Sequence, residues 1–171
     1  MIILSGLSPS AFSNNNMAFL VITALFFAGI ILAKRTKFNL RITARIPVMC
    51  SFIAISGVNF GTYTGDEIYS NGALDVSCDF GTIYNISLGQ GGSGTYSPRQ
   101  MNNSESGLLN YNLYIDGTYA TIWGDGTGGT GTVGGTGTGG TQNYPVYGRA
   151  FAGQNVPVGT YTDSILVTID Y

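Results

Sequence analysis

The sequence contains no histidine and few charged residues of any kind. Only 9% of its 171 residues are Asp, Glu, Lys or Arg, and the formal net charge is -2. The absence of His removes His-based catalytic triads, the commonest general base and the usual zinc ligand. A net negative charge also disfavours binding to nucleic acid. We therefore expect no enzyme activity, no cofactor, no metal, no small-molecule substrate and no nucleic-acid partner.

The carboxylates form no clear acid–base pair. Close groupings occur at Asp66 with Glu67 and at Asp75 with Asp79, in segments that are typical of turns and strand surfaces. Catalysis by two carboxylates requires both to face one substrate. We interpret these four residues as solvated surface groups.

Two glycine-rich segments resemble ligand-binding loops without their essential parts. Residues 89–94, GQGGSG, match the dinucleotide fingerprint, but the following TYSPRQMNN does not begin a helix. We expect a turn between strands there. Residues 124–141, GDGTGGTGTVGGTGTGGT, lack the Lys of a phosphate loop and hold one carboxylate, Asp125, where calcium repeats need several. We expect a long exposed loop or a mobile hairpin tip that contributes nothing to the core.

The longest apolar run is MAFLVITALFFAGIILA, residues 17–33, and Lys34 and Arg35 follow it directly. We interpret residues 1–33 as a leader, with Met17 as an alternative start. A cleaved export signal is favoured over an uncleaved anchor, because an anchor would place the positive cluster on the exported side.

The sequence contains two cysteines, Cys50 and Cys78. An even number of cysteines in an exported chain predicts a disulfide, because the periplasm and the cell exterior are oxidising. Two buried free thiols in a cytosolic protein are the alternative. A catalytic cysteine is disfavoured because no His is present to activate it.

After Cys50 the chain alternates between short strands and turns. Asp116-Gly117 predicts a hairpin leading into residues 118–123, and Trp123 is interpreted as a core anchor. No segment after the leader has a helical period, so the fold class is all-β, most simply an immunoglobulin-like sandwich. The period-two pattern predicts strands at Leu74–Cys78, Tyr84–Leu88, Leu109–Ile115, Asn143–Phe151 and Ser164–Tyr171.

The clearest alternation lies ahead of these strands, in KFNLRITARI, residues 37–46, where no neighbouring segment forms a hairpin with it. At the other end of the chain a second apolar face has no following strand, so the sandwich is expected to be incomplete. The apolar positions of the first segment are Phe38, Leu40, Ile42, Ala44 and Ile46, and those of the second are Ile165, Val167, Ile169 and Tyr171.

Charge is divided unequally along the chain. Five of the seven basic residues lie in residues 34–45, and all nine acidic residues follow Cys50. A basic arm and an acidic body are complementary, which favours head-to-tail contact between identical copies.

The chain resembles the spore coat protein U domain family, the subunits of archaic (Csu-type) chaperone–usher pili. The resemblance runs from about Phe38 to Tyr171, through FNLRITARIPVMC, SGVNFGTY, LDVSCDFGTIYNISLGQG, LLNYNLYID, IWGDGTGGTG, YPVYGR and PVGTYTDSILVTIDY. It implies an incomplete immunoglobulin-like β-sandwich that lacks its last strand and is completed by the N-terminal donor strand of another subunit.

On this resemblance, residues 34–46 are the donor segment and residues 47–171 are the pilin-type domain. The apolar positions from Phe38 to Ile46 would fill core pockets of the next subunit, with Arg41 and Arg45 facing outward. The face from Ile165 to Tyr171 would be the edge that accepts the donor strand or a chaperone strand. The subunit's own first strand is expected to begin between Ala44 and Val48.

The resemblance also implies partners and a location. Related subunits would bind head to tail, with a periplasmic chaperone and an outer-membrane usher acting during assembly. The product would be a fimbrium on a Gram-negative cell that supports adhesion and biofilm formation, with this chain as a shaft or adaptor subunit. Two alternatives remain: a spore or cell coat protein with the same fold, and a self-contained secreted binding module that inserts residues 38–46 into its own sheet.

Overall fold

The structure is a computed structural model that describes residues 35–171, so the leader expected at residues 1–33 lies outside the described residues. The chain divides after Thr43, and the second unit, Ala44–Tyr171, is called the body below. All regular secondary structure of the described residues lies in the body. Within the described residues, no helix has the length and apolarity needed to cross a membrane.

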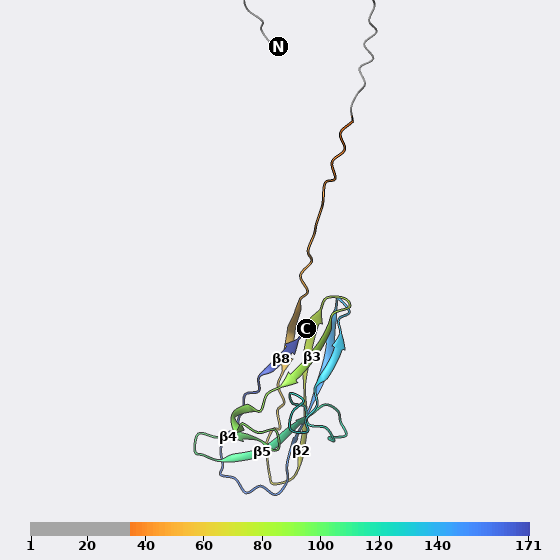
Figure 1. Ribbon diagram of the computed structural model, residues 1–171. Coiled ribbons are helices and arrows are strands. Elements are labelled where there is room, and N and C mark those ends of the chain that lie inside the picture. The colour runs from red at the N-terminus through yellow and green to blue at the C-terminus, as the bar shows by residue number, and fades with distance from the viewer. Residues whose placement is uncertain (1–34) are drawn as a thin grey trace, which may run out of the picture. The chain divides into compact units, whose positions relative to one another are not determined.

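The body is an all-β sandwich of two antiparallel sheets (Figure 1). The large sheet has the order β1-β2-β7-β5-β4 and the small sheet has the order β6-β3-β8. One 3-10 turn, η1, follows β3. The bounds are β1 Cys50–Ser56, β2 Ile68–Cys78, β3 Ile83–Leu88, η1 Gly91–Ser93, β4 Arg99–Asn102, β5 Leu108–Tyr114, β6 Val133–Thr136, β7 Thr141–Ala150 and β8 Val167–Asp170.

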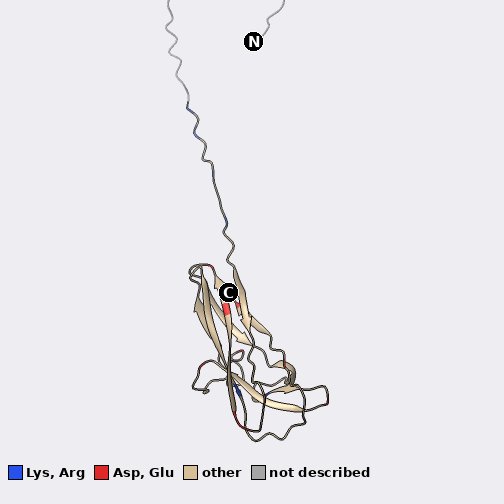
Figure 2. Cartoon of the chain, turned by 180° about the vertical axis from the view of Figure 1, so that it is seen from behind, with Lys and Arg blue, Asp and Glu red and all other residues tan. Residues whose placement is uncertain are grey.

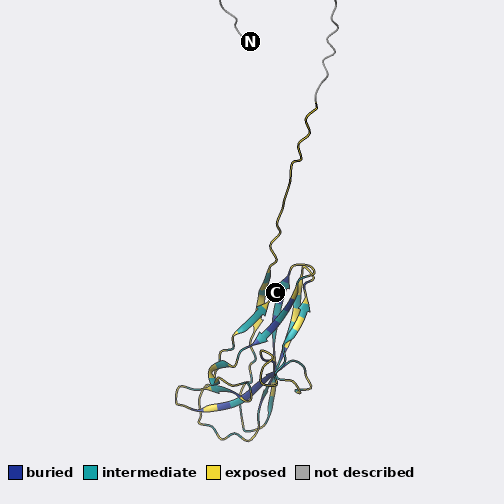
Figure 3. Cartoon of the chain, viewed as in Figure 1, coloured by how far each residue is buried: buried dark blue, intermediate teal, exposed yellow. Residues whose placement is uncertain are grey.

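The core lies between the two sheets and follows the predicted alternation. Leu74, Val76 and Cys78 are buried on β2, and Tyr84, Ile86 and Leu88 are buried on β3, with partly exposed residues between them (Figure 3). Alternate side chains of a strand point to opposite faces, so each sheet supplies one buried face.

Trp123 links the two sheets at the centre of this core. It is fully buried, and its indole N–H donates to the Ile86 carbonyl oxygen on β3 (3.0 Å). Its backbone N–H donates to the Leu113 carbonyl oxygen on β5 (2.9 Å). The interpretation of Trp123 as a core anchor is therefore confirmed.

The expectation for residues 124–141 was wrong in part. Val133–Thr136 form β6, which pairs with β3 in the small sheet, and Val133 packs against the core. Position 135 has no room for a side chain, because a Cβ on Gly135 would lie 2.6 Å from the Tyr84 hydroxyl oxygen and ring. The segment therefore covers the Tyr84 side chain closely and is not a free hairpin tip.

The hairpin predicted at Asp116-Gly117 is confirmed in part. The chain turns here, with the Tyr119 N–H donating to the Asp116 carbonyl oxygen (3.2 Å), and it returns antiparallel to the end of β5, where the Ile115 N–H donates to the Thr121 carbonyl oxygen (3.1 Å) and Tyr114 bridges Ile122. Residues 118–123 form no regular strand. Tyr119 instead packs among three other tyrosines on the outside of the large sheet, at ring-centroid distances of 4.6–6.4 Å.

The first strand begins later than expected. Residues 35–49 have no regular secondary structure, and β1 starts at Cys50 rather than between Ala44 and Val48. At Met49 the chain is fixed to the turn after β2, because the Met49 N–H donates to the Asp79 carboxylate (2.9 Å) and the Asp79 N–H donates to the Met49 carbonyl oxygen (3.0 Å).

The body has two distinct ends, which the pairing register identifies. Cys50 pairs with Cys78, a short turn leads to β3, and Asn85 of β3 pairs with Asp170 of β8, so the start of β1 and the end of β8 share one end. We call this the disulfide end. The opposite end, called the loop end, carries residues 57–65 and 151–163, which connect strands (Figure 1) and pair with a sheet only at the bridge between Thr162 and Asn102 of β4.

The predicted disulfide is confirmed. Cys50 and Cys78 are bonded, 28 residues apart in sequence, and join β1 to β2 where the two strands pair. In the chain-entropy model a loop of this length stabilises the fold by roughly 3 to 4 kcal/mol.

Replacing both cysteines by alanine is expected to lower the free energy of unfolding by about that amount (~3 kcal/mol). Urea denaturation measures the difference. A reducing agent should destabilise the wild-type chain and leave the double variant unchanged. Equal urea midpoints for the two chains would show that the crosslink does not contribute to stability.

Candidate functional site

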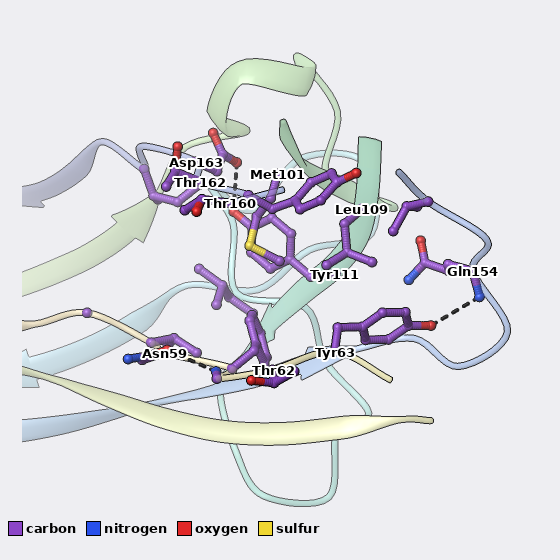
Figure 4. Close-up of a pocket in the computed structure, with 18 of the residues that line it drawn as sticks. Asn59, Thr62, Tyr63, Met101, Leu109, Tyr111, Gln154, Thr160, Thr162 and Asp163 are labelled. Carbon is purple, nitrogen blue, oxygen red and sulfur yellow. Dashed lines mark hydrogen bonds between the residues drawn. The ribbon is translucent and has the colours of Figure 1, made fainter. Parts of the chain in front are cut away.

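A groove of about 1000 Å³ opens along one side of the sandwich. One wall is residues 55–65, which continue from β1, and the other is residues 154–167, which lead into β8 (Figure 4). The two walls belong to the edges of different sheets, since β1 ends the order of the large sheet and β8 ends that of the small sheet. The groove therefore lies where the two layers are not closed by a strand.

The floor of this groove consists of core side chains. They come from both sheets, and most of them belong to the buried cluster at the centre of the body. A groove whose floor is the hydrophobic core favours an apolar occupant, because covering the floor removes apolar surface from water. The floor residues are Leu74, Leu88, Met101, Leu109, Tyr111, Leu113 and Val146.

The β8 wall also offers an unpaired backbone edge. The Gly89 N–H donates to the Leu166 carbonyl oxygen (2.8 Å) in the continuation of the β3–β8 ladder. Ladder bonds of an antiparallel pair are made by alternate residues, so even-numbered residues of β8 bond toward β3. The others direct their N–H and C=O groups away from β3, where no described strand pairs with them. These are Ile165, Val167 and Ile169.

The opposite wall packs closely against the large sheet. Val58 and Phe60 lie over Gly148 of β7, and a Cβ on Gly148 would come within 2.5 Å of Val58 Cγ1 and 3.0 Å of Phe60 Cζ. The absence of a side chain at this position lets the wall approach the sheet. Both side chains line the groove and pack against the core cluster.

Hydrogen bonds hold the loop end of the groove in place. The Tyr63 hydroxyl donates to the Phe151 carbonyl oxygen (2.8 Å) and accepts from the Gln154 N–H (3.0 Å), which joins the two walls (Figure 4). The Gln154 side chain also exchanges hydrogen bonds with the Asn110 backbone on β5 (2.6 and 2.9 Å). The walls are therefore positioned before any occupant arrives.

Asp163 fixes the β8 wall to the floor. Its carboxylate accepts from the Tyr111 hydroxyl (2.7 Å) and from the Gly92 N–H (2.8 Å) (Figure 4). Burial, together with the hydrogen bond to Asp163, raises the pKa of Tyr111, so the phenol stays neutral and remains a donor.

Arg99 is a buried charged residue that was not predicted. It is fully buried, and its guanidinium donates to the carbonyl oxygens of Gly89 (2.8 and 3.0 Å) and Trp123 (2.7 Å). Burial lowers the pKa of Arg99. The sequence carried one signal for it, because Arg99 and Arg149 are the two basic residues after Cys50. Arg99 therefore links the backbone just before η1 to that of Trp123 in the core.

The sequence-predicted residues occupy the following positions. Ile165, just before β8, and Val167 and Ile169 on β8 are partly buried against the core, whereas Tyr171 lies beyond the strand and is exposed. Phe38, Leu40, Ile42 and Ile46 are 84–88% exposed, and Ala44, Arg41 and Arg45 are exposed as well.

The carboxylate groupings do not form a site. Glu67 forms an ion pair with Arg149 on the large sheet, and Asp75 accepts a hydrogen bond from the Asn143 amide (2.6 Å). Side-chain hydrogen bonds from Tyr69 and Arg149 lower the pKa of Glu67. Residues 35–171 contain no group of three or more Cys, Asp or Glu residues placed to hold a metal ion. The acidic residues are spread over the body (Figure 2).

Comparison with known proteins places this geometry in a family. The sequence pattern of the Spore Coat Protein U domain matches residues 36–168. The chain belongs to the Spore Coat Protein U domain family. The match begins at residue 36, well before β1, so the family domain includes the exposed alternating segment as well as the sandwich.

Two known proteins show the relationship in more detail. Protein U of Myxococcus xanthus is 38% identical over 151 residues, which cover 78% of this chain and 83% of Protein U. The fold resembles a solved CsuC-CsuE chaperone-tip adhesion subunit pre-assembly complex from the archaic chaperone-usher Csu pili of Acinetobacter baumannii. The TM-score is 0.56 at 23% identity, and the match covers 74% of this chain and 40% of the solved chain. This second comparison supports the immunoglobulin-like fold of the family domain.

Proposed function

We propose that this protein is a structural subunit of a surface fibre that assembles by donor-strand complementation, supporting adhesion and biofilm formation. The groove carries this proposal. It combines a floor of core side chains with the unpaired backbone of Ile165, Val167 and Ile169. An added β-strand would cover the apolar floor and form hydrogen bonds with this backbone.

The donor is residues 37–46 of a second copy. Its apolar side chains alternate with polar ones, so a single strand can place Phe38, Leu40 and Ile42 on the groove floor while Arg41 faces outward. Burying the four large apolar side chains of this segment stabilises the contact by roughly 6 to 12 kcal/mol before ordering costs are subtracted. Contacts of this size are compatible with a permanent polymer.

The position of the chain ends determines the direction of the donor strand. The donor segment of each subunit joins its own body at the disulfide end, where β8 also finishes. A donor parallel to β8 would place the disulfide end of each body against the disulfide end of the next. Such an arrangement gathers these ends together and does not extend into a fibre. A donor antiparallel to β8 joins the disulfide end of one body to the loop end of the next. The contact is heterologous and does not close, so it makes a filament.

Assembly requires partners that cover the groove beforehand. An open apolar groove beside an unpaired edge promotes aggregation. A periplasmic chaperone strand in the groove would prevent this, and an outer-membrane usher would exchange it for the donor strand. The solved relative is itself a chaperone complex of such a pilus. The basic donor segment and the acidic body of the next subunit would attract each other during the exchange.

The proposal is tested by adding the donor as a peptide. A truncated body, residues 47–171, is mixed with a synthetic peptide of residues 37–47, and its melting temperature is followed. We expect a large rise in melting temperature with peptide concentration, because a ligand that binds only the folded state stabilises it.

A matched peptide with Ile42→Asp provides the control and should raise the melting temperature little, since it places a carboxylate over the apolar floor. Cooperative, high-temperature melting of the body without peptide would instead mean that the fold is already complete, and would favour the self-contained binding module.

A spore or cell coat is a second candidate assembly. The family name and the similarity to Protein U favour it, and the same strand exchange would operate in a coat. Immunogold labelling of intact cells separates the two, because a pilus subunit marks thin fibres that extend from the cell and a coat subunit marks a continuous layer.

A further inference from the structure

The disulfide end of the body carries an exposed apolar patch that the donor-strand contact does not use. Phe80, at the tip of the turn between β2 and β3, is 87% exposed, and Ile83 beside it is 79% exposed. Val48 and Met49 are exposed on the chain entering the same end. The Met49 backbone is hydrogen-bonded to Asp79, so all four residues lie on or beside the turn between β2 and β3. We call these four residues the end patch.

The connection between the donor segment and the end patch is very short. Ile46 is the last donor position, and Met49 is already fixed to the turn by its two hydrogen bonds with Asp79. Only Pro47 and Val48 lie between them, and an extended chain spans about 10 Å over this interval. Once a donor strand is inserted antiparallel to β8, this short connection brings the end patch of its own body close to the loop end of the acceptor.

The loop end offers a surface that fits this patch. Residues 154–160, QNVPVGT, contain no charged side chain, and Val158 is 94% exposed. This loop is held rather than free, because Gln154 is bonded to Tyr63 (3.0 Å) and the Pro157 carbonyl oxygen accepts from the Tyr161 hydroxyl (2.7 Å). Phe80 and Val158 therefore expose large apolar side chains at opposite ends of the same body, where most such side chains are buried.

We propose that the end patch of one subunit packs against residues 154–160 of the next, as a second contact between bodies in the fibre. The occupant of each surface is thus another copy of this chain. The inference rests on the proposed function, because the inserted donor strand is what brings the two ends together. It adds a contact that fixes the angle between neighbouring bodies. With strand insertion alone, this angle would be set only by the connection of Pro47 and Val48.

Photo-crosslinking in assembled fibres tests this contact. Phe80 is replaced by the photoreactive amino acid p-benzoylphenylalanine in the full chain, which keeps an aromatic ring at the turn and adds no cysteine near the disulfide. After irradiation of the polymer, mass spectrometry identifies the crosslinked peptide. We expect crosslinks between subunits that map to residues 154–160, and we expect Val158→Asp in the same chain to reduce them strongly.

The matched control places the same photoreactive residue at Tyr69, which is half exposed on β2 among the tyrosines outside the large sheet, and should yield no crosslink between subunits to residues 154–160. Polymer that forms normally but crosslinks elsewhere from position 80 overturns the second contact and leaves donor-strand exchange standing. If the wild-type full chain forms no polymer, both the proposed function and this contact are wrong.

Discussion

Ile42→Asp is expected to abolish polymerisation of the full chain. Ile42 is the middle apolar position of the donor segment, and in the proposed fibre it lies on the floor of the neighbouring groove. A carboxylate buried there without a partner costs several kcal/mol, comparable with the net gain from the whole strand. In its own chain the residue is 85% exposed, so the substitution leaves the body intact. Polymer ladders on gels of unboiled samples measure the effect.

Thr43→Asp is the matched control, because the neighbouring residue faces the opposite side of a strand and its carboxylate stays in water. This variant should polymerise like the wild type. Both variants should still be captured by a chaperone, since the groove of each is unchanged. Polymerisation of the Ile42→Asp chain would show that residues 37–46 are not the donor, and loss of chaperone capture as well would indicate a folding defect.

Trp123→Ala is expected to reduce the free energy of unfolding of the body by about 3 to 5 kcal/mol, the usual range for deleting a large buried aromatic ring. The ring is fully buried between the sheets. Its removal leaves a cavity and also deprives the Ile86 carbonyl oxygen of its indole donor. Urea denaturation of chaperone-free protein measures the change, and marginal stability would make the variant partly unfolded at 37 °C.

Trp123→Phe separates the two effects. Phenylalanine fills much of the same space and cannot donate, so a loss of about 1 to 3 kcal/mol is expected from the unsatisfied carbonyl oxygen and the remaining gap. A loss as large as that of the alanine variant would mean that the hydrogen bond, rather than packing, dominates at this position.

Much of the fold could be predicted because alternation and burial agree. Leu74–Cys78 and Tyr84–Leu88 alternate in the sequence and lie in β2 and β3 with the expected residues buried. The turn at residues 89–94 was also predicted, since no helix could begin after it. The apolar face of β8 and the residues before it was recognised from Ile165, Val167 and Ile169, which pack against the core.

The remaining elements depend on contacts between distant segments, which a local pattern does not contain. β6 has two glycines at its centre, which have low strand propensity, and it forms because it pairs with β3 against Tyr84. The groove wall at residues 154–160 has no period at all and is positioned by Gln154 and Tyr63. Burial of Arg99 depends on the carbonyl oxygens of Gly89 and Trp123, which are far apart in sequence and are brought together by the fold.

The placement of the disulfide has a mechanical consequence for the proposed fibre. Tension along the fibre would pass from each donor strand through Pro47 and Val48 to Cys50, the first residue of β1. Cys50 is covalently bonded to Cys78 on β2, which is paired on both sides, with β1 and with β7. Pulling force therefore enters an interior strand directly and does not peel the edge strand β1 away from its sheet. Each subunit would resist stretching as a unit, and extension of the fibre would occur between subunits.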